Sequence, residues 1–161
     1  SLHDALPICE SLPLAPELSL LLDARTTAAV VGRMLALAAE CGGQGTIMIP
    51  VYPRFGGFVP DSDSVAFDVT LDVEGYNLGP DGHFFAVASH VHTIDCGQEQ
   101  DTYYSGYSYS FIPMFPPDGV ADINVIDGKP GHLHLTLHTP DGDLPFDADV
   151  VLSAAIQDCG Y

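Results

Sequence analysis

The sequence Gly-His-Leu-His-Leu-Thr-Leu-His at residues 131–138 constrains the fold more than any other stretch of this chain. Successive side chains of a β-strand point to opposite faces of its sheet. Leu133, Leu135 and Leu137 would therefore share one face. The other face would carry the polar residues His132, His134, Thr136 and His138. The octet thus predicts a strand with a buried apolar face and a polar outer face.

Other segments show the same two-residue alternation, and turn residues separate them. The clearest runs from Val65 to Glu74, where apolar residues alternate with mostly polar ones. Further short strands are expected at 47–49, 83–92, 103–111, 120–126, 132–138 and 150–156. About seven short strands with turns at this spacing are typical of a β-sandwich or a barrel. We therefore predict one all-β domain over residues 45–161.

Residues 10–44 differ in composition from the expected β domain. Apolar residues recur every three or four positions between Leu18 and Glu40, and Gly42 and Gly43 follow. This spacing predicts a helix that ends at the glycines. The sequence Leu-Ala-Ala-Glu-Cys-Gly-Gly at 37–43 also resembles the end of a bacterial lipoprotein signal. That resemblance implies a mature chain beginning at a lipidated Cys41, and hence a lipid anchor.

The first eight residues, Ser-Leu-His-Asp-Ala-Leu-Pro-Ile, resemble the translation of a common sequencing adapter. We expect residues 1–9 to be an artefact or disordered, and they enter no argument on fold or function. The alternative is a genuine amino-terminal segment.

The charge balance excludes one class of partner. Acidic residues outnumber basic ones by 22 to 4, which gives a formal net charge of -18. Such a chain repels phosphate backbones, so nucleic-acid binding is not expected. It favours cations or basic partners instead. No apolar run reaches the roughly 18 residues of a membrane helix, so no transmembrane span is predicted.

Five histidines lie on two of the expected strands. His90 and His92 flank Val91, and a His-x-His pair can supply two imidazoles to copper or zinc. His134 or His138 would be the third ligand if the strands share a face. The alternative is an exposed sheet face without metal, because alternation alone explains the spacing.

Two further groups of residues suggest binding. The acidic turns at 61–64 and 141–143 offer hard oxygen ligands for Ca²⁺, with plain solvated turns as the alternative. Tyr103, Tyr107 and Tyr109 alternate with serine and glycine. They predict a surface for a protein or glycan partner, with an ordinary tyrosine-lined strand as the alternative.

The four cysteines are spaced too widely for a C-x-x-C zinc or redox site. Cys96 and Cys159 both lie in an Asp-Cys-Gly tripeptide. One interpretation is a Cys96–Cys159 disulfide in an oxidising compartment, and the other is two buried free thiols.

Two family resemblances attach to the later part of the chain. The stretches VTLDVEGYNLGPDGHFFAV at 69–87 and PGHLHLTLHTPDGDLPFDADVVLSAAI at 130–156 resemble immunoglobulin-like domains of bacterial secreted proteins and lipoproteins. This resemblance implies a Greek-key β-sandwich with an accessory or adhesive role outside the cytoplasm.

The second resemblance is to Cu/Zn superoxide dismutase. It rests on His90-Val91-His92 with Asp95-Cys96, and on His138 before an acidic turn. It implies a copper site at His90, His92 and His138, with Cys159 as a disulfide partner.

The leading hypothesis is a non-catalytic extracytoplasmic binding or structural module without a cofactor. In one version of this hypothesis the module is a surface lipoprotein. The alternative is a copper-binding, dismutase-like protein. No nucleophile elbow, P-loop, dinucleotide fingerprint or H-E-x-x-H motif is present.

Overall fold

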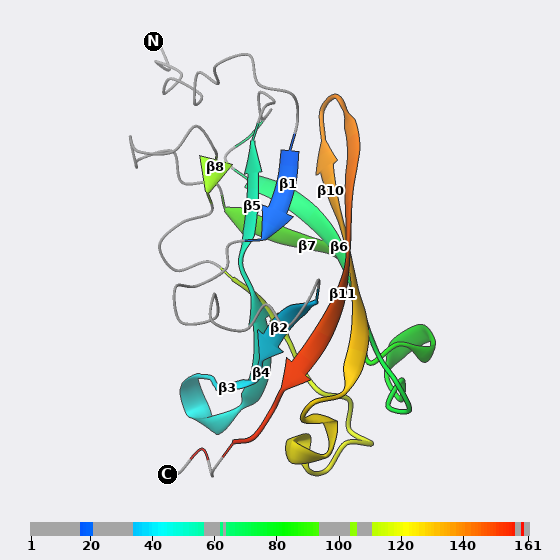
Figure 1. The fold of residues 1–161 in the computed structure, drawn as a ribbon. Coiled ribbons are helices and arrows are strands. Elements are labelled where there is room, and N and C mark those ends of the chain that lie inside the picture. Colours follow the sequence, from blue (N-terminus) through cyan, green and yellow to red (C-terminus); the bar gives the residue numbers. More distant parts are fainter. Residues whose placement is uncertain are drawn as a thin grey trace.

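The computed structural model describes residues 17–20, 34–56, 62, 64–93, 104–105, 111–156 and 159. These residues form an all-β structure in which two layers of sheet face each other (Figure 1). The predicted β-sandwich is therefore confirmed. None of the helical turns in the described part of the chain has the length or apolar character needed to cross a bilayer.

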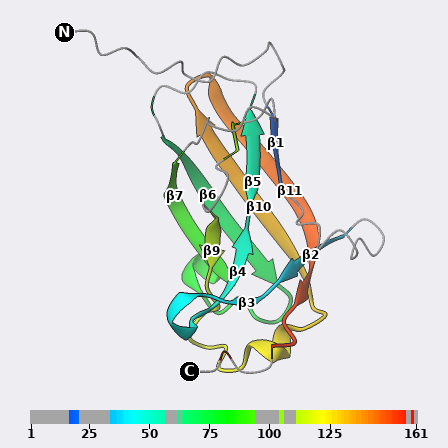
Figure 2. The same ribbon diagram turned by 90° about the vertical axis from the view of Figure 1, so that its left-hand side faces the viewer.

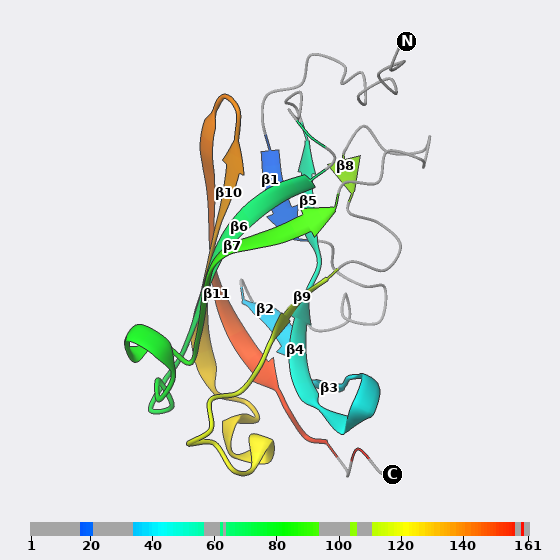
Figure 3. The same cartoon turned by 180° about the vertical axis from the view of Figure 1, so that it is seen from behind.

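The larger layer is a five-stranded sheet in the order β2-β11-β10-β6-β7. Its strands are β2 (Leu35–Ala38), β11 (Gly142–Ser153), β10 (Pro130–Thr139), β6 (Ser64–Val73) and β7 (Phe85–Thr93). β2 pairs with β11 in parallel, and every other pairing is antiparallel. Figure 3 shows β7 lying beside β6 at one edge of this sheet.

The opposite layer is built along two successive strands, β4 (Ile47–Val51) and β5 (Pro53–Gly56). They form the centres of two three-stranded sheets, β3-β4-β9 and β1-β5-β8, and lie across the larger sheet (Figure 2). Their partners are β1 (Glu17–Leu20), β3 (Glu40–Cys41), β8 (Tyr104–Ser105) and β9 (Ile112–Met114). Short 3₁₀ turns complete the fold: η2 (Gly43–Gly45), η3 (Pro80–Gly82) and η4 (Ile123–Ile126).

Alternation along the strands builds the core between the layers. Leu133, Leu135 and Leu137 of β10 are each 0% exposed, so the orientation predicted from the octet is confirmed. The apolar residues of β6 from Val65 to Val73 are buried in the same way. Ile49, Val51, Phe55, Ile112 and Met114 close the core from the opposite layer.

The helix predicted between Leu18 and Glu40 is wrong where this segment is described. Residues 17–20 and 35–38 form β1 and β2 instead. β2 buries Leu37 and forms a parallel ladder with β11, which satisfies its backbone hydrogen bonds. Pairing with an existing sheet edge therefore outweighs the helix propensity of leucine and alanine.

The strand predicted at 120–126 is also wrong, because residues 123–126 form η4. The Asp122 side chain accepts a hydrogen bond from the backbone N–H of Asn124, which caps the turn. Ile123 and Ile126, three positions apart, are the buried residues of this turn. That spacing belongs to a helical turn rather than to a strand.

Gly131 allows β10 to approach β6 closely. A Cβ built at this position would collide with the backbone carbonyl oxygen of Asp72 and lie 3.2 Å from side-chain atoms of Val150 and Leu152. We expect Gly131→Ala to lower the free energy of unfolding by about 1–3 kcal/mol, because β10 must shift in a packed sheet. Urea denaturation measures this change. Gly43→Ala is the control, since nothing lies within 4 Å of a Cβ there; equal effects of the two substitutions would contradict the prediction.

Candidate functional site

A β-bulge interrupts the pairing of β7 with β6. Phe67 pairs with His90 and Val69 pairs with Val87, so two residues of β7 face one residue of β6. Ser89 lies in the bulge with a positive φ of 55°. Its backbone N–H donates a hydrogen bond of 2.8 Å to Oδ1 of Asp68.

The bulge reverses which side chains of β7 face the core. Before it, Val87 pairs with the buried Val69, and after it His92 pairs with the buried Val65. His92 is only 2% exposed, and its ring lies edge-on to Phe55 and Phe67, with centroids 6.1 and 5.8 Å away. Val91 points outward instead and is 67% exposed.

The outer face of the five-stranded sheet carries imidazoles between two rows of carboxylates. On β10 these imidazoles are His132, His134 and His138. The carboxylates are Asp143, Asp147 and Asp149 on β11 and Asp68 and Asp72 on β6. We call this set, together with His83, the His–Asp face. His83 joins it through Asp72, to which its Nδ1 lies within 2.9 Å.

His138 lies between two carboxylates on neighbouring strands. Its Nδ1 is 2.8 Å from Oδ1 of Asp143 on β11. Its Nε2 is 3.1 Å from Oδ2 of Asp68 on β6. Since Asp68 also accepts the N–H of Ser89, the bulge helps to position this carboxylate.

His132 is held in the same way by two carboxylates of β11. Its Nδ1 is 3.0 Å from Asp149 and its Nε2 is 3.2 Å from Asp147. Asp147 also lies 2.7 Å from Nδ1 of His134, whose Nε2 is 3.0 Å from Oγ1 of Thr136.

These contacts favour the protonated imidazoles. A neutral imidazole has a single N–H, so only the imidazolium form can donate to two carboxylates at once. The hydrogen bond with Asp149, and then that with Asp147, raises the pKa of His132. The hydrogen bonds with Asp143 and Asp68 raise the pKa of His138.

Two of the carboxylates are perturbed in the complementary direction. The pKa of Asp68 is lowered, first by the backbone N–H of Ser89 and then by His138. Hydrogen bonds with His134 and His132 lower the pKa of Asp147. The ionised carboxylate and the protonated imidazole thus stabilise each other.

A hollow of about 300 Å³ lies at one end of the His–Asp face. Its lining is largely small or apolar and comprises Ser64, Val65, Ala66, Val91, His138, Thr139 and Pro140. His138 therefore lines this hollow and also binds the carboxylates of Asp68 and Asp143. Exposed apolar surface is thus placed directly beside the charged rows.

The predicted metal site is not assembled. His90 and His92 pair with core-facing residues, whereas His134 and His138 lie on the opposite, outer face of the same sheet. The prediction that His90 and His92 bind one metal ion together with His134 or His138 is therefore wrong. The alternative of an exposed face fits His134 and His138 but is wrong for the buried His92. Within the described ranges, no group of three or more His, Cys, Asp or Glu side chains is placed to hold a metal ion.

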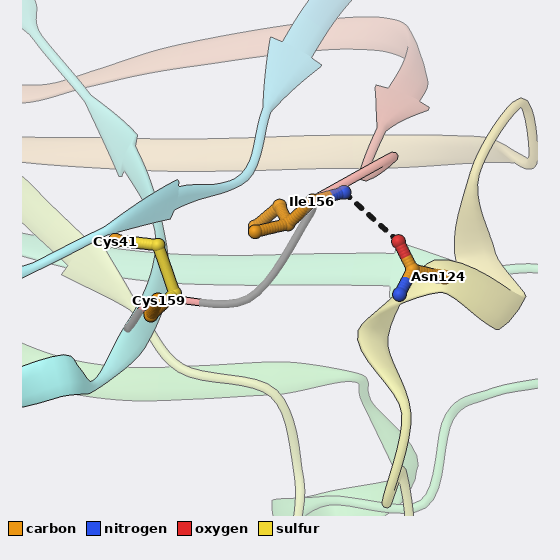
Figure 4. Close-up of a disulfide and its surroundings, with 4 residues drawn as sticks. All are labelled: Cys41, Asn124, Ile156 and Cys159. Carbon is orange, nitrogen blue, oxygen red and sulfur yellow. Dashed lines mark hydrogen bonds between the residues drawn. A yellow bond between two sulfur atoms is a disulfide. The ribbon is translucent and has the colours of Figure 1, made fainter. Parts of the chain in front are cut away.

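The disulfide of Cys159 is formed with Cys41, so the predicted Cys96–Cys159 pairing is wrong (Figure 4). β2 leads into β3 beside the end of β11, which brings the two Cα atoms within 5.5 Å. Nearby, the backbone N–H of Ile156 donates to Oδ1 of Asn124. A sulfur atom in a disulfide cannot carry a thioether-linked lipid, so the prediction of lipidation at Cys41 is also wrong.

Several of the other predicted sites lie outside the described residues, and one acidic turn lies within them. Tyr103, Tyr107, Tyr109, Cys96, residues 1–9 and the acidic positions Asp61 and Asp63 lie outside the described residues. The acidic turn at 141–143 connects β10 to β11, and its Asp143 binds His138.

No family model, curated protein or solved structure matches the chain. Function must therefore follow from the geometry of the described residues. That geometry offers an exposed valine in a hollow and two rows of carboxylates with imidazoles between them.

Proposed function

We propose that this chain is a non-catalytic extracytoplasmic module that binds a partner protein through the His–Asp face and its adjoining hollow. The observation that carries the proposal is the outward position of Val91, at 67% exposure, in a hollow at one end of the His–Asp face. An exposed apolar side chain in a concave site with a polar rim is a common feature of interaction surfaces.

The β-bulge supports a functional reason for this exposure. Regular alternation would bury Val91 and expose His92, which is the better outcome for stability alone. The bulge instead requires positive φ at Ser89, a serine rather than a glycine. Bulges that redirect a side chain occur preferentially near functional sites.

The chemistry of the rim identifies the kind of partner. Carboxylates of Asp68 and Asp143 lie beside the hollow, and Asp147 and Asp149 extend the negative charge along β11. The chain as a whole carries a net charge of -18. We therefore infer a polypeptide segment with an apolar side chain for the hollow, flanked by lysine or arginine.

The location outside the cytoplasm is proposed on the disulfide. Cys41 and Cys159 form a disulfide. Disulfides persist in oxidising compartments and are rare in the reducing cytosol.

An immunoglobulin-like fold is likewise part of the proposal. The order β11-β10-β6-β7 corresponds to strands G-F-C-C′ of that fold, and β4–β5 beside β9 and β8 corresponds to B beside E. The chain has no tryptophan, and Cys41–Cys159 is not the inter-sheet B–F disulfide of antibody domains. The correspondence therefore rests on strand order alone.

The probe for this proposal is the peptide Lys-Lys-Leu-Lys-Lys, titrated at pH 7.5 and followed by NMR amide shifts. We expect saturable shifts at residues that line the hollow, such as Ala66, Val91 and Thr139. Val91→Ser should weaken binding about tenfold, or ~1.4 kcal/mol, because the leucine loses an apolar contact. Stability should change little, since the Val91 side chain is exposed.

Matched controls separate this site from general charge attraction. Val125→Ser alters another exposed valine, 42% exposed in η4, and should leave the affinity unchanged. The peptide Lys-Lys-Ser-Lys-Lys should bind more weakly than the leucine peptide. Equal binding of the two peptides, or no effect of Val91→Ser, would overturn the proposal. An oligosaccharide that shifts these residues when the peptide does not would replace the protein partner by a glycan.

A further inference from the structure

We propose that protonation of His132 and His138 gates the His–Asp face, so that it binds a basic partner when these two imidazoles are neutral and releases it when they are protonated. The imidazolium forms occupy the carboxylates that the partner's lysine or arginine side chains need. The identity of the partner rests on the proposed function, but the exchange of proton for partner follows from the contacts of the two imidazoles.

The surroundings of His138 contain two opposing charges. β11 contributes Asp143, and β6 contributes Asp68. On its own strand, His134 is the nearest titratable group on the same face. β7 contributes the backbone N–H of Ser89 and the apolar Val91, and no titratable side chain of its described residues takes part. Loss of the proton therefore leaves two carboxylates beside the hollow with at most one N–H between them.

The surroundings of His132 are similar. β11 contributes Asp147 and Asp149, and β6 contributes Asp72, which pairs across from His132 and binds His83. His134 on the same strand shares Asp147. Neither lysine nor arginine contributes to these contacts in the described part of the chain.

The face changes charge strongly with pH. Its five carboxylates contact the four imidazoles of His83, His132, His134 and His138. Protonation of His132 and His138 adds two positive charges to this face of five carboxylates. A basic partner experiences this difference directly, because it needs the same carboxylate oxygens.

The sign of the linked stability follows from the directions of the shifts. The pKa values of His132 and His138 are raised above 6.5. The ion pairs of these two imidazoles therefore stabilise the fold fully below pH 6.5, and this stabilisation is lost as the pH rises through the raised pKa values. The pKa values of Asp68 and Asp147 are lowered below 3.8, so their contribution persists above pH 3.8 and is lost as the pH falls through the lowered values. Both halves of the pairs are charged between these limits. Below the raised pKa values of His132 and His138, a basic partner must therefore displace imidazolium ions from the carboxylates in order to bind.

The first measurement needs no partner. NMR titration of the imidazole carbons between pH 4 and 9 should place the pKa values of His132 and His138 above 6.5. Asp149→Asn should move the pKa of His132 downward and leave that of His138 unchanged; Asp143→Asn should do the reverse. Two imidazoles that titrate at or below 6.5 would overturn the gate, whether or not any peptide binds.

The second measurement couples the gate to binding. The affinity for Lys-Lys-Leu-Lys-Lys should rise about three- to tenfold from pH 5.5 to pH 8, since each exposed pair is weak. The double variant His132→Gln/His138→Gln should bind at pH 5.5 nearly as tightly as the wild type does at pH 8. His90→Gln, on the other face of the sheet, is the control and should keep the wild-type pH dependence. Reciprocally, saturating peptide should lower the pKa of His138.

The outcomes separate the two proposals. Raised imidazole pKa values without peptide binding at any pH would reject the proposed partner and leave the proton-dependent pairs established. Binding that is independent of pH, or a double variant that keeps the wild-type pH dependence, would overturn the gate and leave the binding module standing.

Discussion

Removing the Cys41–Cys159 disulfide will lower the free energy of unfolding by about 3–5 kcal/mol. The bond joins residues 118 positions apart, so it greatly restricts the unfolded chain. It also anchors β3 to the segment after β11, next to the edge strand β2. In a domain of ordinary stability, a loss of this size removes a large part of the margin against unfolding.

The test uses the double variant Cys41→Ser/Cys159→Ser, because each single variant leaves an unpaired thiol. Urea unfolding of the double variant and of the wild type gives the difference in free energy. Each single variant should lose about as much as the double variant, since all three lack the same bond. A loss below about 1 kcal/mol in the double variant would show that the bond contributes little to stability.

Replacing Leu135 by alanine should lower the free energy of unfolding by about 2–5 kcal/mol. Leu135 is 0% exposed in the middle of β10 and pairs with Val69 on one side and Phe146 on the other. The substitution leaves a cavity at the centre of the sandwich, where the neighbouring strands cannot easily close it.

The adjacent residue offers a matched control. Thr136 lies on the outer face of the same strand, and its Oγ1 contacts Nε2 of His134. Thr136→Ala should lower the stability by no more than about 1 kcal/mol, the scale of one partly exposed hydrogen bond. Urea denaturation of both variants at one pH makes the comparison. Comparable losses in the two variants would contradict the arrangement of β10.

The faces of β10 and β6 could be read from the sequence because each strand keeps a strict two-residue period. The period alone assigned Leu135 and Val69 to the core, without information on which strands lie beside them, and both are buried. The carboxylates opposite the histidines carried a similar signal: Asp147 and Asp149 alternate with Phe146 and Ala148. That signal indicates one exposed face on β11, but the register that brings Asp149 to His132 exists only in the paired sheet.

The site around Val91 could not be predicted, because the bulge is a property of two strands. Alternation correctly places His90 and His92 opposite Val91, yet it does not say which of the two sides is buried. The choice depends on where β7 gains one residue relative to β6, at Ser89. The predicted metal site shared by His90, His92, His134 and His138 is not assembled for this reason and because β6 lies between β7 and β10 in the sheet.

Strands β1 and β2, for which a helix was predicted, were missed for a different reason. Leu35 and Leu37 suit a helix as well as a strand, and only the free edge of β11 decides between them. The partner of Cys159 was likewise decided by where β2 and β3 lie, which no spacing of cysteines reveals.

The covalent link between positions 41 and 159 also determines how the molecule would bear a mechanical load. Force that enters before Cys41 and leaves after Cys159 can pass through the sulfur bridge, bypassing strands β4 to β11 that lie within the loop. β1 and β2 precede the bridge and would take the tension first, with β1 separating from β5 and β2 from β11. Reduction of the bridge would transfer the same pull to the ladders of the sandwich itself.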